Sequence, residues 1–68
     1  MKQIFTWSDR MLQQDLHKAR RLLDYNPTNW TYFEMRRAAH MIKPIIPVQQ
    51  VLLALEAEKQ SSLQTLAL

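Results

Sequence analysis

The 68-residue chain contains no glycine and no cysteine. Glycine reaches positive φ angles without steric cost, so hairpins, bulges and phosphate-binding loops commonly depend on it. Its absence favours helices and argues against Rossmann and P-loop nucleotide sites. The absence of cysteine excludes a disulfide framework and removes the thiolate ligands of the usual zinc fingers.

Long apolar runs are also missing. The longest apolar stretches are interrupted by Lys43, Pro44 and Pro47, and none approaches the roughly 20 residues of a membrane-spanning helix. The first seven residues, MKQIFTW, are too short and too polar for a secretory signal. We therefore expect a cytoplasmic protein that has no membrane partner.

The composition that remains is typical of an ordered globular chain, with 47% hydrophobic and 22% charged residues. A chain of this length has one small core and is marginally stable alone. We expect a single helical domain over residues 1–60 and a frayed or disordered tail over residues 61–68. We also expect a homodimer, or a partner whose binding adds buried apolar area.

The spacing of apolar residues predicts three helices. The first runs from an N-cap at Ser8 to about Tyr25 and is stopped by Asn26-Pro27. Its core stripe repeats at helical spacing and comprises Leu12, Leu16, Ala19 and Leu23. The second runs from about Trp30 to Ile42, with Thr28 or Asn29 as its cap. Its predicted core side comprises Tyr32, Met35, Ala38, Ala39 and Ile42.

The third helix is expected to start at Pro47, since proline suits a first helical turn. Its stripe comprises Val48, Val51, Leu52 and Leu55. Lys59 falls on that stripe, so we expect the helix to fray or leave the core near residue 60. The prediction is an all-α fold: a three-helix bundle, or a helical hairpin plus a third helix, with an N-terminal arm over residues 1–7. We expect Trp30 in the core and leave Trp7 open between core and partner contact.

The sequence contains few residues in a pattern that suits catalysis or metal binding. His17 and His40 lie beside basic residues, and no carboxylate or nucleophile stands at a helical spacing that would form a relay. No cysteine is present, and the two histidines are on separate helices, so they form no metal-ligand pattern. We therefore predict a protein that is not an enzyme, with no catalytic, metal-binding or cofactor-binding residues.

The basic residues are the most informative feature. The net charge is +3, and residues 1–43 carry eight Lys and Arg against four Asp and Glu. Two helical faces gather them, and the candidate partner-binding residues are Arg10, Lys18 and Arg21 on the first helix and Phe33, Arg36, Arg37, His40 and Lys43 on the second. Arginine beside an aromatic ring is common in protein and nucleic-acid contacts. The alternative is a solvated face whose arginine stems cover apolar surface.

Two functions fit this pattern. The first is a small regulator or inhibitor that binds a larger protein stoichiometrically, placing its basic surface on an acidic patch. The second is binding to nucleic acid. Residues 2–42 resemble a ribbon-helix-helix repressor, with a strand over Lys2 to Trp7, a helix, a turn at Asn26-Pro27-Thr28 and a second helix. That resemblance implies a dimer that binds DNA.

The chain departs from this family in having a third helix, and Ile4, which a strand would turn toward DNA, is a poor reader of bases. A helix-turn-helix is no better supported, because the links contain proline. A net charge of +3 is low for a chain that relies on phosphate contacts. We therefore predict the protein-binding regulator first and the DNA-binding repressor as the alternative.

Overall fold

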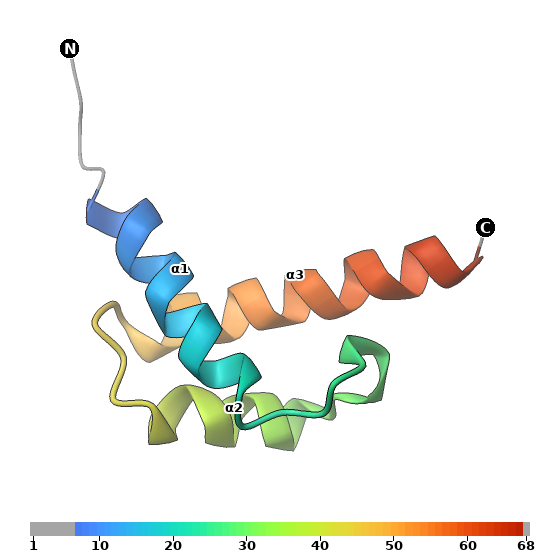
Figure 1. Cartoon of the computed structure of the whole chain (residues 1–68), viewed down its shortest axis with the longest axis horizontal. Coiled ribbons are helices and arrows are strands. Elements are labelled where there is room, and N and C mark those ends of the chain that lie inside the picture. Colours follow the sequence, from blue (N-terminus) through green and yellow to red (C-terminus); the bar gives the residue numbers. More distant parts are fainter. Residues whose placement is uncertain (1–6, 68) are drawn as a thin grey trace, which may run out of the picture.

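The computed structural model describes residues 7–67 of the chain. It consists of α1 (Trp7–Arg20), a short 3-10 helix η1 (Pro27–Asn29), α2 (Tyr32–Met41) and α3 (Val48–Ala67), and residues 7–67 include no strand. In Figure 1, α2 and α3 run alongside each other and α1 crosses them, and each of the three helices contacts the other two. The all-α fold predicted from the sequence is confirmed. Of the predicted N-terminal arm, residues 1–6 lie outside the described residues and Trp7 begins α1.

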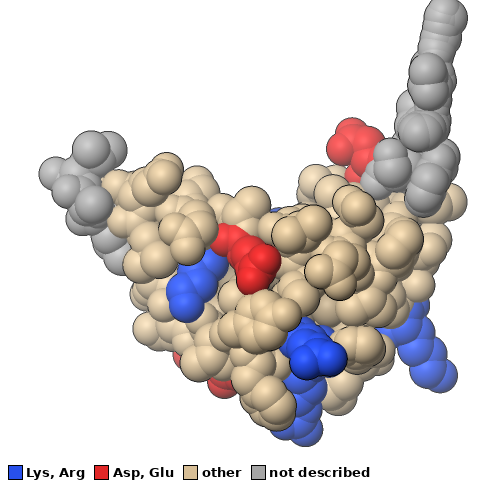
Figure 2. Space-filling model, turned by 180° about the vertical axis from the view of Figure 1, so that it is seen from behind, with Lys and Arg blue, Asp and Glu red and all other residues tan. Residues whose placement is uncertain are grey.

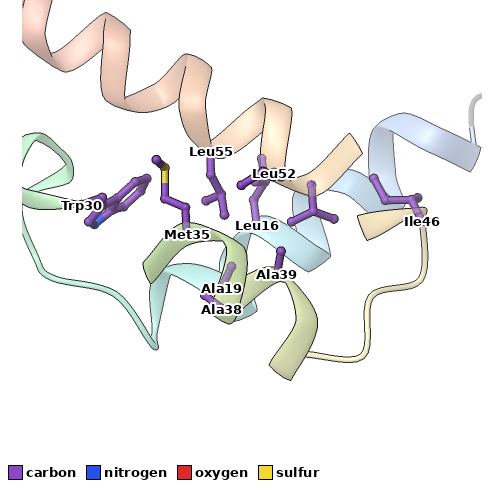
Figure 3. Packing of buried hydrophobic residues seen from close by; sticks show 10 residues of the cluster. Leu16, Ala19, Trp30, Met35, Ala38, Ala39, Ile46, Leu52 and Leu55 are labelled. Carbon is purple, nitrogen blue, oxygen red and sulfur yellow. The ribbon is translucent and has the colours of Figure 1, made fainter. Parts of the chain in front are cut away.

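The core is a row of buried apolar side chains between the three helices, with Trp30 at one end and Ile46 at the other (Figure 3). It comprises Leu16, Ala19, Trp30, Met35, Ala38, Ala39, Ile46, Val51, Leu52 and Leu55. Most of the predicted stripe positions are among them, and the prediction that Trp30 is a core residue is confirmed. Tyr32 was wrongly placed in the core, since its side chain is 54% exposed. It is the first residue of α2, outside the Met35/Ala38/Ala39 side that faces the other helices.

α1 begins one residue before the expected N-cap Ser8 and ends at Arg20, five residues before the predicted end at Tyr25. The backbone first tightens, with i to i−3 hydrogen bonds such as Leu22 N–H to the Ala19 carbonyl (3.0 Å). The Asp24 side chain then accepts the Asn26 N–H (2.8 Å). Such a local side-chain bond offers the backbone an alternative to the helix, which explains the early end.

α2 begins at Tyr32, later than predicted, because Thr31 is its cap. The Thr31 hydroxyl accepts the Glu34 N–H and the Glu34 carboxylate accepts the Thr31 N–H, both at 3.1 Å. This reciprocal capping box is readable as Thr-x-x-Glu, and the sequence prediction overlooked it. Trp30 stays outside the helix because its indole N–H donates to the Asp24 carbonyl (2.8 Å).

Residues 42–47 join α2 to α3, and we call this segment the connector. Hydrogen bonds to a single carboxylate hold it in place. Asp15 of α1 is fully buried, and its oxygens accept the Ile45 N–H (2.9 and 3.1 Å) and the Ile46 N–H (3.1 Å). Before this point Lys43 turns the chain in the left-handed region, with φ at 54°. Glycine normally ends helices in this conformation, and a chain without glycine uses a lysine there.

α3 continues to Ala67, whereas the sequence led us to expect a tail from residue 61. Lys59 does fall on the buried side of the helix, but its ammonium group donates to the Trp30 carbonyl. The charged end of the lysine therefore lies outside the row of buried apolar side chains, and the helix continues past this residue. In Figure 1 the last turns of α3 project beyond the other helices.

Residues 7–67 do not show the order of strand, helix and helix that defines the ribbon-helix-helix family. Trp7 is helical instead of ending a strand, and residues 2–6 lie outside the described residues. α3 contributes Val51, Leu52 and Leu55 to the same core as α1 and α2, so it is part of the domain and not an appendage. No helix within residues 7–67 has both the length and the apolar character that crossing a membrane requires.

We predict that Asp15→Ala destabilises the fold by about 2–4 kcal/mol, because the buried N–H of Ile46 and the partly buried N–H of Ile45 lose their acceptor. Asp15→Asn should cost less, since an amide oxygen in the position of Oδ2 still accepts from both Ile45 and Ile46. Asp9→Ala, at an exposed position of the same helix, should cost no more than about 1 kcal/mol. Urea denaturation followed by circular dichroism measures all three, and equal losses for Asp15→Ala and Asp9→Ala would contradict the assigned role.

Candidate functional site

The basic residues singled out from the sequence are all exposed, and the structure distributes them over separate surfaces. In Figure 2 the Lys and Arg side chains of one face lie mostly along its lower part, separated by uncharged surface. They do not merge into one continuous basic patch in that view. Some of these residues nevertheless share a depression with other candidate residues.

Four of the candidates come together on α2. Phe33, Arg36, Arg37 and His40 line one shallow depression of about 300 Å³, which we call the α2 outer surface. They stand at i, i+3, i+4 and i+7, a spacing that places side chains on one side of a helix. Met35, Ala38 and Ala39 lie on the buried side of α2 and fix its orientation. The capping box at Thr31 fixes where the helix begins.

The aromatic ring is the notable member of the α2 outer surface. Phe33 is 70% exposed, although its side chain is fully apolar. None of the described residues that line the depression is acidic, and the lining consists of two guanidinium groups, an imidazole and one phenyl ring. Guanidinium groups bind carboxylates through paired N–H groups and also stack on aromatic rings. This arrangement suits a partner that offers anionic groups beside an apolar contact.

The second group of candidates lies on α1. Arg10 and Lys18 line a broader and more open depression of about 720 Å³, together with His17, Gln13, Gln14 and Asp9. Asp9 offsets one of the two positive charges there. The α1 depression shares no lining residue with the α2 outer surface. The two basic faces expected from the sequence are thus separate surfaces.

The remaining two candidates are isolated from both depressions. Arg21 follows the end of α1, and Lys43 follows the end of α2. Neither lines the α1 depression or the α2 outer surface. Arg20, which was not a candidate, forms a bidentate contact with Glu58 of α3 (Nη2 to Oε1, 2.9 Å) and so has a structural role.

Sequence reasoning missed a third depression, which we call the Leu22 notch. It has a volume of about 300 Å³ and is lined by Leu22, Glu34, Arg37, Ala38 and Met41. The sequence prediction extended the first helix to about Tyr25 and therefore through Leu22. Because α1 ends at Arg20, Leu22 instead follows the helix and lines this notch. The Asp24-Tyr25-Asn26-Pro27 sequence was the available signal for that early end.

The described residues give little support to metal binding or catalysis. Within residues 7–67 no three His, Asp or Glu side chains come close enough together to hold a metal ion. His17 and His40 are both exposed. Asp15 is the one buried acidic residue of this part of the chain, and its oxygens are occupied by backbone N–H groups of the connector.

Comparison with protein-family models, curated proteins and solved structures found no match to this chain. Its function therefore has to be argued from its own residues and surfaces.

We predict that the double variant Arg36→Glu, Arg37→Glu keeps the fold. Both side chains are exposed and outside the core, so the free energy of unfolding should change by less than about 1 kcal/mol. Leu52→Ala, at a buried position of α3, should lower it by about 2–5 kcal/mol. Thermal unfolding followed by circular dichroism compares them, and a loss of helix in the double variant would show that these arginines support the fold.

Proposed function

We propose that this chain is a non-enzymatic cytoplasmic regulator that binds a larger protein stoichiometrically and inhibits it. In this proposal the α2 outer surface sits on an acidic patch of the partner. The observation that carries it is the exposed Phe33 ring in one depression with Arg36, Arg37 and His40. An exposed aromatic residue flanked by arginines is the composition typical of interface hot spots.

The way α2 is held supports this assignment. A binding surface is more effective when its residues are presented by a rigid element, because less side-chain and backbone entropy is lost on binding. α2 has a capping box at one end and three buried residues, Met35, Ala38 and Ala39, on its inner side. The four residues of the outer surface are therefore presented from a helix anchored in the core.

The charge balance favours α2 over α1 as the contact. An acidic patch is attracted by both arginines of the α2 outer surface, and no carboxylate lines that depression. In the α1 depression, Asp9 opposes the attraction of Arg10 and Lys18. Like charges facing each other across an interface lower affinity, so the α1 depression is the poorer site for an acidic partner.

The non-enzymatic part of the proposal follows from the same lining. His40 is the residue of the α2 outer surface whose side chain is of the type that most often serves as a general base. A general base normally acts beside a nucleophile or an orienting carboxylate. The other residues of this depression are Phe33, Arg36 and Arg37, none of which supplies either role.

The alternative is a dimeric DNA-binding repressor, and it has less support. An aromatic ring beside arginines also suits stacking with nucleic-acid bases. The net charge of +3 is small for phosphate binding, however. The third helix, which shares the core with the other two, has no counterpart in the ribbon-helix-helix family that residues 2–42 resemble. Nucleic-acid binding is therefore included as an outcome of the test.

We predict that Arg36→Glu with Arg37→Glu removes one specific protein from an affinity pull-down that the wild-type chain retains. Loss of buried charged contacts costs about 2–5 kcal/mol, and reversal adds repulsion, so affinity should fall by about 30-fold or more. The matched control is Arg10→Glu with Lys18→Glu, which changes the net charge by the same amount and alters the α1 depression instead. The control should retain the protein.

The pull-down is repeated after nuclease treatment, and a duplex DNA shift is measured at low salt. Retention of the protein after nuclease treatment and no duplex shift are the results expected for a protein-binding regulator. A duplex shift that weakens steeply with salt would instead support the repressor. If the α1 variant loses the protein and the α2 variant keeps it, the contact surface has been assigned to the wrong helix.

A further inference from the structure

The Leu22 notch exposes two large apolar side chains that the fold itself does not use. Leu22 is 51% exposed and Met41 is 56% exposed. Exposed apolar residues that are scattered singly are ordinary on a protein surface. These two come from different parts of the chain, beyond the end of α1 and at the end of α2, and line one depression.

The notch also carries one charge of each sign. Glu34 and Arg37 line it and stand three residues apart on α2. Among residues 7–67 the one ion pair joins Arg20 and Glu58, so Glu34 and Arg37 are not paired with any charged side chain of this part of the chain. The Glu34 carboxylate accepts the Thr31 N–H through Oε1, and no hydrogen bond within residues 7–67 engages its second oxygen.

We propose that the Leu22 notch is the contact surface between two copies of this chain. When two α2 helices meet in antiparallel orientation about a two-fold axis, Glu34 of each copy faces Arg37 of the second copy. The same surface is then complementary to itself, which is the requirement of a two-fold dimer. Leu22 and Met41, which are exposed in the single chain and line the same depression, then lose contact with water.

This charge pattern argues against the acidic partner as the occupant of the notch. Glu34 would repel an acidic patch, whereas it is matched by an arginine of a second copy. The proposal does not depend on the function assigned to the α2 outer surface, because it concerns the purified chain alone. It gives a location to the homodimer that the length and the surplus apolar residues of the chain predict.

Sedimentation velocity of the full chain, from low micromolar to submillimolar concentration, tests the proposal. The wild-type chain should shift from its 8.1 kDa monomer mass toward twice that value. Leu22→Glu should raise the dimer dissociation constant by at least about tenfold, because it places a charge against an apolar surface. Leu53→Glu is the matched control, since Leu53 of α3 is also 51% exposed and does not line the notch. It should leave the constant unchanged.

Exchanging the charges of Glu34 and Arg37 gives a second, independent test of the dimer. Glu34→Lys alone and Arg37→Glu alone should each weaken the dimer by about tenfold, since each places like charges opposite each other. The variant that carries both should recover most of the wild-type affinity, because the two charges have changed places. Glu34→Lys removes half of the capping box, so circular dichroism must show that it remains folded. If it unfolds, the matched leucine variants decide alone.

Three results would overturn the proposal. One is a wild-type chain that remains monomeric over the whole concentration range. Another is a dimer that Leu53→Glu weakens as much as Leu22→Glu does. The third is a folded charge-exchange variant that is no more dimeric than the two single variants. Arg37 lines both surfaces, but Leu22 and Leu53 do not line the α2 outer surface, so the leucine variants distinguish failure here from failure of the proposed function.

Discussion

The arrangement of the helices depends on the buried carboxylate of Asp15. The connector between α2 and α3 contains Pro44 and Pro47, which cannot donate hydrogen bonds. Between them the N–H groups of Ile45 and Ile46 both reach into α1 and end on this one side chain. The connector therefore follows a fixed path, Ile46 enters the core, and α3 starts where its apolar stripe meets α1 and α2. Buried polar groups that lack partners are costly, so this satisfied set specifies one path for the connector.

The sequence predicted the helices and much of the core because apolar spacing records burial directly. Leu16, Ala19, Val51, Leu52 and Leu55 all belong to regular stripes. Helix ends were predicted less well, since they depend on side-chain bonds such as those of Asp24 and Thr31. Asp15 was not recognised at all. It stands between Gln14 and the core residue Leu16, and its partners are 30 and 31 positions away, so no local pattern marks it.

The candidate surfaces were likewise predicted where their residues belong to one helix and missed where the residues lie far apart in the sequence. Phe33, Arg36, Arg37 and His40 were predicted together because they share one side of one helix, and the structure places them in one depression. The sequence also grouped Arg21 and Lys43 with them as candidates. Arg21 lies past the end of α1, which the spacing placed at Tyr25, and Lys43 lies past the end of α2. The Leu22 notch was missed because it joins residues of α2 to a residue past the end of α1. Arg37 lines both this notch and the α2 outer surface. A chain paired through the notch would therefore offer less of its outer surface to a partner.

Three polar ties connect parts of the chain that are far apart in sequence. Asp15 joins the connector across 30 and 31 positions, Lys59 joins Trp30 across 29, and Arg20 joins Glu58 across 38. Each tie closes a loop of close to half the chain, and together they link α1, the end of η1, the α2–α3 connector and α3. No helix pair can thus keep its native contacts without the rest, and unfolding should be all-or-none. Cleavage of one peptide bond in either connecting loop would release a fragment with no core of its own, so the smallest folded unit is the whole described domain.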